Sequence, residues 1–279
     1  MIKIYNPTSP GIRFRKTLVR NLTTSKPNKK LTIHLKGASG RSNGRVSTRH
    51  KEVGSKKLYR IIDFKRNKLN IPAKVSTIEY CPYRGSNIAL VTYKDGEKRY
   101  ILGPEGLNVG DTIVSGENVD FNTGNALPLA KIPLGMFIHN IEINPGAGGI
   151  MVRGAGNYAQ ITAKDGKYVT IKLPSGEIKN VLASCFATLG ILSNTDLRNT
   201  QLGKAGKNRH KGVRPAVRGV AMPDPGKHPH AGSYKDKGIG MPSPKTPWGQ
   251  KTKGFKTRRR KNTNYTIVTS RHIAKNKRK

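Results

Sequence analysis

Alternating apolar and polar positions occur mainly in the middle of this chain, where they predict short β-strands. Segments 74–80, 87–93 and 98–102 are rich in β-branched and aromatic residues, and 111–116 is a further strand bounded by glycines. The turn 94–97 joins two of these strands, and its Asp-Gly pair is typical of a type I′ hairpin turn with positive φ angles. Several short strands at this spacing predict a small closed barrel.

A second all-β unit is predicted further along, after Pro128 and Pro133, which indicate a linker. Its expected strands are 136–143, 157–163, 168–173 and 177–183, with a second Lys-Asp-Gly-Lys hairpin turn at 164–167. Apolar residues alternate with Thr and Lys along 168–173, as in a strand with one buried face.

Both ends of the chain lack such periodicity. Glycine and proline recur every few positions in 203–248, and 36–57 has a similar composition. Such segments bury too little apolar surface to offset the entropy lost on ordering. Segment 36–57 is followed by apolar residues that we expect to anchor it to the barrel: Leu58, Tyr59, Ile61, Ile62 and Phe64. A flexible, solvated tail is the alternative interpretation of either segment.

The charge distribution changes this picture. The chain has 279 residues and a formal net charge of +38. Residues 1–70 carry a net charge of +17 and residues 201–279 carry +20, whereas residues 71–200 carry only +1. Self-repulsion of this size opposes compaction unless a polyanion neutralises it. Two cationic arms flank a nearly neutral β core, and this arrangement indicates a nucleic-acid partner.

Other classes of protein fit the sequence less well. No apolar run is long enough to cross a bilayer, the N-terminal sequence lacks the apolar region of a signal peptide, and the arms have no apolar face for a membrane surface. Cys81 and Cys185 are expected to be reduced, buried residues. A DNA-compacting protein and an RNA chaperone that acts off the ribosome remain alternatives, although helix-turn-helix spacing, RNP-like aromatic residues and zinc-finger ligands are absent from the sequence.

Specific motifs point to one family. They include GRSNGR (40–45), YRIIDFKRNK (59–68), NIALVTYKDGEKRYIL (87–102), AKDGKYVTIKLPSGE (163–177), RPAVRGVAM (214–222) and TPWG (246–249). In order and spacing they resemble the ribosomal protein L2 family of the large subunit, in its bacterial or organellar form. The resemblance covers nearly the whole chain.

This resemblance implies a mainly β fold in which an OB-fold barrel is followed by an SH3-like barrel. The implied divisions are a basic N-terminal extension (1–60), the OB-fold domain (61–125), the SH3-like barrel (126–200) and a basic Gly/Pro-rich C-terminal extension that penetrates rRNA (201–279). It also implies a non-enzymatic constituent of the large ribosomal subunit that supports subunit association, tRNA binding and the architecture of the peptidyl transferase centre. The implied partners are large-subunit rRNA, small-subunit rRNA at the subunit interface and neighbouring ribosomal proteins, and the implied location is the ribosome of a bacterial cytoplasm or an organelle. We expect no membrane, cofactor or metal partner.

The candidate rRNA-binding residues combine phosphate-binding cations with side chains that stack on bases. They are Arg41, Arg45, Arg49, His50, Lys57, Arg60, Lys65, Arg66, Arg153, Lys204, Lys207, Arg209, Arg214, Arg218, His228, His230, Trp248, Lys251, Lys253 and Arg258. Arg153 lies among five glycines that would allow close approach to RNA, although a plain hairpin loop explains that segment equally well.

A catalytic interpretation of His228 competes with a structural one, because imidazole titrates near neutral pH. A general base of this kind is usually oriented by a carboxylate, but Lys227 precedes His228 here. His228 and His230 also lack further metal ligands nearby in the sequence. We therefore expect both histidines to contact RNA and expect no catalytic residue. The chain departs from the usual family pattern at 51–56, His210, 223–227 and 231–235.

Overall fold

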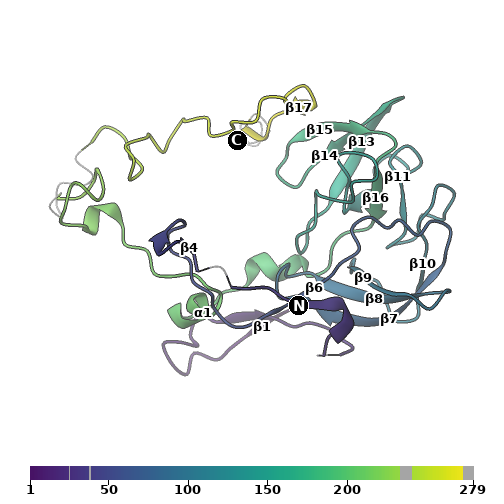
Figure 1. Ribbon diagram of the computed structural model, residues 1–279, viewed down its shortest axis with the longest axis horizontal. Coiled ribbons are helices and arrows are strands. Elements are labelled where there is room, and N and C mark those ends of the chain that lie inside the picture. Colours follow the sequence, from purple (N-terminus) through teal and green to yellow (C-terminus); the bar gives the residue numbers. More distant parts are fainter. Residues whose placement is uncertain (25, 38, 233–240, 273–279) are drawn as a thin grey trace. The chain divides into compact units, whose positions relative to one another are not determined.

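The computed structural model describes residues 1–24, 26–37, 39–232 and 241–272 (Figure 1). Within these residues the chain forms two compact units. The first unit is built from 1–36, 56–207 and the described part of 263–279; the second is built from 37–55 and the described part of 208–262. Segments of both basic arms therefore fold together in the second unit. No described helix is long and apolar enough to cross a membrane.

The first sheet of the first unit is four-stranded and antiparallel, in the order β10-β7-β8-β9 (Figure 1). Its strands are β7 (Ala73–Tyr80), β8 (Asn87–Tyr93), β9 (Lys98–Leu102) and β10 (Thr112–Ile113). Alternate residues of β8 pack into two different apolar clusters, because Ala89 and Val91 face one cluster and Ile88 and Leu90 the other. This sheet is therefore covered on both faces.

Residues before β7 supply the cover for one of these faces. Strand β3 (Thr32–His34) pairs with β6 (Leu58–Arg60), and Ile62 and Phe64 pack into the cluster beyond β6. The predicted anchor is confirmed for these two residues. It is wrong for Leu58 and Ile61, which are 40% and 43% exposed.

The second sheet has seven antiparallel strands in the order β11-β16-β12-β13-β14-β15-β17. It surrounds the largest apolar cluster, which includes Ile138, Ile161 and Ile171. The two curled sheets confirm the mainly β prediction and agree with an OB-fold barrel followed by an SH3-like barrel. The strands are β11 (Ala126–Pro128), β12 (Phe137–His139), β13 (Ala159–Asp165), β14 (Tyr168–Lys172), β15 (Ile178–Leu182), β16 (Phe186–Leu189) and β17 (Ile267–Thr269).

The remaining elements are short. Strand β1 (Ile2–Ile4) pairs with β2 (Lys16–Leu18), and β4 (Arg41–Ser42) pairs with β5 (Arg45–Val46). In the described residues, 3₁₀ turns lie at η1 (Lys29–Leu31), η2 (Thr195–Asn199) and η3 (Gly219–Ala221). The helix α1 (Ala205–His210) has no buried residue. Its presence corrects the expectation that 203–248 lacks regular structure, because local backbone hydrogen bonds form one short helix there without an apolar face.

Two further expectations are wrong in detail. Pro128 does not lie in a linker but ends the buried strand β11, where an edge position tolerates the missing N–H. The strand predicted over 136–143 is only Phe137–His139, because Asn140 turns the backbone with a φ of 51°.

The hairpin turns also differ from the type I′ geometry. At 94–97 only Gly96 has a positive φ, and its N–H donates to the carbonyl of Tyr93 at 2.9 Å. At 164–167 only Gly166 has a positive φ. The N–H of Tyr93 donates to the carbonyl of Glu97, so the hairpin has the three-residue loop 94–96, in which the glycine alone takes the left-handed conformation.

Burial shifts the pKa values of Cys185 and His139. Both cysteines are free and buried, as expected, and burial raises the pKa of Cys185 to about 11. His139 is fully buried at the end of β12, and its Nδ1 lies 2.8 Å from the carbonyl of Gly190. Burial lowers the pKa of His139 to about 4.

We expect the stability of the fold to fall as the pH is lowered from about 6.5 to about 4. The unfolded chain takes up a proton on His139 in this range and the folded chain does not, so up to about 3 kcal/mol is lost. His139→Asn keeps a side-chain donor for Gly190 but does not titrate, so its unfolding free energy should depend less on pH in urea titrations. An equal pH dependence in both proteins would contradict this assignment.

Candidate nucleic-acid interface

A cluster of cations and aromatic rings lies on the first unit around Phe64. The guanidinium carbons of Arg84 and Arg153 lie 4.7 and 4.6 Å from the centre of the Phe64 ring. Arg84 also donates to the hydroxyl of Tyr59 at 3.2 Å, and the Tyr59 ring meets the Tyr83 ring edge-on with centroids 5.4 Å apart. This arrangement offers two guanidinium forks beside aromatic surface.

The electrostatics of this cluster favour an anion. Burial lowers the pKa of Arg153, and the positive charge of Arg84 lowers it further. Within the described residues neither guanidinium has a carboxylate within ion-pair distance. Two like charges held together are stabilised when a phosphate binds between or beside them.

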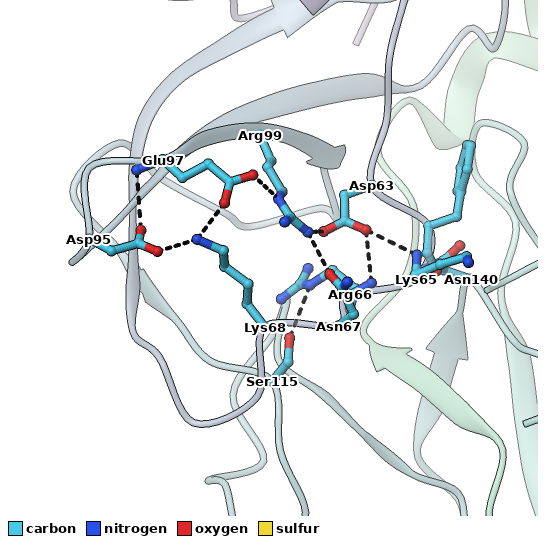
Figure 2. A network of polar contacts seen from close by, with 11 residues as sticks. Asp63, Lys65, Arg66, Asn67, Lys68, Asp95, Glu97, Arg99, Ser115 and Asn140 are labelled. Atoms are coloured by element: carbon cyan, nitrogen blue, oxygen red, sulfur yellow. Dashed lines mark hydrogen bonds and ion pairs between the residues drawn. The ribbon is translucent and has the colours of Figure 1, made fainter. Parts of the chain in front are cut away.

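Two carboxylates, the partly buried Asp63 and the buried Glu142, position the loops that carry this cluster. Asp63 accepts from the backbone N–H groups of Lys65 and Arg66 at 3.0 and 2.9 Å, and Arg66 has a left-handed φ of 51° (Figure 2). Glu142 accepts from the N–H groups of Gly146 and Gly148 at 3.2 and 2.8 Å. Each carboxylate thus fixes a turn whose backbone would otherwise be poorly restrained.

The two turns meet at the cluster. The carbonyl of Phe64 accepts from Gly149 at 2.9 Å, and Arg153 donates to the carbonyl of Gly149 at 3.2 Å. A Cβ on Gly148 would lie 3.1 Å from the Lys65 side chain, so a glycine permits this close approach. Arg153, which the sequence singled out, is therefore held against Phe64 by its own glycine-rich loop.

Adjacent residues of the segment 63–68 have different environments. Lys65 is exposed, whereas Arg66 is 5% exposed and donates to Ser115 at 3.1 Å and to the carbonyl of Gly124 at 3.2 Å (Figure 2). Arg60 is also buried and donates to the carbonyl of Leu58 at 2.8 Å. The guanidinium groups of Arg60 and Arg66 thus bind carbonyl and hydroxyl oxygens of the protein itself.

A charge-balanced network lies beside Arg66. Lys68 pairs with Asp95 and Glu97, while Arg99 pairs with Glu97 at 2.6 Å and with Asp63 at 2.9 Å (Figure 2). The hydrogen bond that Arg99 donates to Glu97 raises the pKa of Arg99, and the one that Lys68 donates to Asp95 lowers the pKa of Asp95. Because its cations are neutralised within the protein, this surface is less suited to phosphate than the Phe64 cluster.

The structure reveals cations that the sequence reasoning missed. In the β1–β2 hairpin, Arg15 and Lys3 lie over the Tyr5 ring, 4.3 and 5.4 Å from its centre. The hydrogen bond between the Tyr5 and Thr17 hydroxyl groups and the charge of Arg15 lower the pKa of Tyr5. Lys3 lies in β1 and Tyr5 directly follows this strand, and their spacing of two residues would have indicated one shared face. Arg84 carried no comparable signal, because its partner Phe64 is distant in sequence.

In the second unit, segments from the two arms pair with each other. Lys51 and Val213 form an antiparallel bridge, and the N–H of Arg214 donates to the carbonyl of His50 at 3.1 Å. Glu52 binds Arg209 at 2.9 Å and lies 3.8 Å from Arg214. The segment 51–56, where the chain departs from the usual family pattern, therefore supplies an acid that links the arms.

An exposed aromatic residue also joins these arms. The guanidinium carbon of Arg49 lies 4.9 Å from the Trp248 ring, and Trp248 is 76% exposed. A stacked tryptophan and arginine of this kind can accept a nucleobase. Of the other candidate residues, Lys57 and Lys207 are partly exposed, and the exposed ones are Arg41, Arg45, Lys204, Arg218, Lys251, Lys253 and Arg258.

The two histidines of the HPH motif hold protein segments together. The Nδ1 of His228 accepts from the N–H of His230 at 3.1 Å, and the Nε2 of the buried His230 accepts from the N–H of Lys245 at 2.7 Å. A Cβ on Gly219 would lie 2.3 Å from the His228 ring, so this ring packs against bare backbone. In the described parts of the chain, no group of three or more potential ligands could hold a metal ion.

Family models and a known protein match this chain over most of its length. The family model described as Ribosomal Proteins L2, RNA binding N-terminal domain matches residues 28–115, and that described as Ribosomal Proteins L2, C-terminal domain matches 122–249. The large ribosomal subunit protein uL2 of Wolinella succinogenes is 52% identical to this chain over 273 residues. That alignment covers 97% of this chain and 98% of the relative.

We expect Arg66→Ala to lower the free energy of unfolding by about 2 kcal/mol or more, because it leaves buried acceptors of the first unit without their donor. Lys65→Ala is the matched control, since it removes an exposed cation from the neighbouring position and should change stability by less than about 0.5 kcal/mol. Urea denaturation measures both. Equal effects would show that burial of Arg66 contributes nothing to the fold.

Proposed function

Because the chain belongs to the ribosomal protein L2 family, we propose that it is a structural protein of the large ribosomal subunit that binds large-subunit rRNA. The relative's name identifies that protein as part of the large subunit, and the description of the N-terminal family model includes RNA binding. The family is one of structural ribosomal proteins rather than enzymes.

The Phe64 cluster is the observation that carries this proposal. Arg84 and Arg153 converge on one aromatic ring with no described carboxylate to neutralise them. Phosphodiester oxygens match paired guanidinium groups, and unstacked bases match exposed aromatic rings. Folded RNA supplies both kinds of group along one surface, so it fits this cluster better than an isolated anion does.

The finer roles belong to the second unit in our proposal. Its paired arms carry exposed cations together with the stacked Arg49 and Trp248, which suits penetration between rRNA segments. We assign to these arms the support of subunit association, tRNA binding and the architecture of the peptidyl transferase centre. Small-subunit rRNA and neighbouring ribosomal proteins are the further partners, in a bacterial cytoplasm or an organelle. The proposed divisions remain 1–60, 61–125, 126–200 and 201–279.

The geometry of His228 favours a scaffold role over a catalytic one. Its Nδ1 already accepts a hydrogen bond from the backbone, and its ring packs against Gly219. A general base needs its lone pair free for the proton that it removes. We therefore assign His228 to holding the turn that carries it.

Replacing both Arg84 and Arg153 by Gln should weaken binding to a large-subunit rRNA transcript and flatten its salt dependence. Each lost phosphate contact removes roughly 0.7–0.9 from the slope of log K against log salt, so the pair should remove about 1.5. Filter binding across a salt series measures the slope. The control is the double variant Lys131→Gln/Lys167→Gln, which removes two exposed lysines near the second sheet and should leave the slope nearly unchanged. Equal slopes for all three proteins would contradict the proposed site.

For the histidine, we expect His228→Ala subunits that assemble to form peptide bonds within about tenfold of the wild-type rate. Loss of general-base catalysis would cost roughly 10²–10⁴-fold. Arg218→Ala should reduce assembly more than His228→Ala does, because Arg218 is an exposed cation available to phosphate. Single-turnover rates and gradient sedimentation provide the two measurements, and a rate loss of 10²-fold or more in assembled His228→Ala subunits would overturn the scaffold role.

A further inference from the structure

The C-terminal arm is attached to the first unit at both ends. Within α1 the chain passes from the first unit to the second at residue 208, and it returns to the first unit at 263. There β17 pairs antiparallel with β15, so that Thr269 faces Ile178 (Figure 1). The N–H of Asn180 also donates to the carbonyl of Thr266 at 2.8 Å. Residues 208–262 therefore form a loop closed by a strand rather than a tail.

The pairing of β17 rests on backbone hydrogen bonds more than on the apolar core. Val268, its central residue, is 59% exposed, and no residue of β17 is buried. The turn before it is held locally, because Ile267 donates to the carbonyl of Asn264 at 3.0 Å. Without β17, strand β15 would be the open edge of the second sheet. A short exposed strand adds little to the stability of the core. The effect of β17 must therefore act through the segment 208–262, whose end it fixes.

Closing the loop changes the entropy that RNA binding must overcome. Residues 208–262 contain fifteen lysines and arginines but only two acidic residues, Asp224 and Asp236. A free cationic tail samples many conformations, and all but a few are lost when its phosphate contacts form. A loop fixed at both ends has already lost part of this freedom in the unbound protein.

We propose that β17 is a positioning strand: by closing the C-terminal arm into a loop, it raises the affinity of that arm for RNA without itself contacting phosphate. This inference rests on the proposed binding of large-subunit rRNA. It assigns to β17 an effect on affinity and none on the number of ionic contacts. The two quantities are measured separately, as the affinity at one salt concentration and as the slope of affinity with salt.

The test uses the full-length chain with Ile267→Pro, because Ile267 pairs with Lys179 of β15 and its N–H donates to the carbonyl of Asn264 in the turn before the strand. Proline removes this N–H and restricts the backbone of Thr266, whose carbonyl accepts from Asn180, and it alters no charge. Ile267→Val is the matched control, because valine keeps the β-branched shape. We expect Ile267→Pro to bind a bacterial large-subunit rRNA transcript roughly tenfold more weakly, with an unchanged salt slope. Hydrogen exchange at the Asn180 amide should be faster in Ile267→Pro and unchanged in Ile267→Val.

A reversible cross-link provides the second measurement. Ile178 and Thr269 face each other across the two strands, at a separation that suits a disulfide in antiparallel pairs. Adding Ile178→Cys and Thr269→Cys to Ile267→Pro should restore the affinity when the pair is oxidised, and reduction should abolish the gain. The two native cysteines are buried and should not interfere.

Each result of these experiments either supports or overturns the proposed role of β17. Unchanged affinity in Ile267→Pro, unchanged amide exchange at Asn180, or no rescue by the disulfide would overturn the role of β17. A flatter salt slope would also overturn it, since β17 would then supply phosphate contacts. Failure of the wild-type chain to bind the transcript would instead refute the proposed function, so the two failures are distinguishable.

Discussion

Mutual repulsion among the cations is the constraint on which this structure depends. With 53 lysines and arginines against 15 acids, the chain has few carboxylates with which to hold itself together. Several of these carboxylates bind backbone N–H groups in turns or link separate segments, and do not simply neutralise exposed cations at the surface. Asp63 and Glu142 each accept two or more backbone N–H groups, and Glu52 links two segments that are distant in sequence.

This use of acids leaves selected cations unneutralised. Arg84 and Arg153 are held in place by an aromatic ring and by carbonyl or hydroxyl groups, none of which cancels their charge. Around Lys68 and Arg99, in contrast, carboxylates neutralise the cations (Figure 2). Cations with carboxylate partners and cations without them therefore lie on different parts of one unit. Only the cations without a carboxylate partner have their full charge available for RNA.

The basic arms are held by backbone pairing and not by an apolar core. They contain few apolar residues, yet backbone pairing gives them defined attachment points, through β3 and β6 for one arm and β15 and β17 for the other. Such pairing requires no apolar core and leaves the charged side chains exposed. A segment of this kind can remain highly cationic and still begin and end at fixed positions.

The sequence alone determined the features that depend on local pattern. Strand 87–93 follows from its β-branched and aromatic residues, and strand 168–172 follows from alternating apolar residues. The neutral core follows from charge counts, and the family follows from ordered motifs. Tertiary structure decided the rest, because it depends on partners far away in the chain. Lys65 and Arg66 are neighbours of the same chemical type, but the turn held by Asp63 directs Arg66 inward to Ser115 and leaves Lys65 exposed. Likewise Arg84 joins the interface only because Phe64 lies beside it, and the three residues of β17 become a strand only because the edge of β15 is open to pair with them.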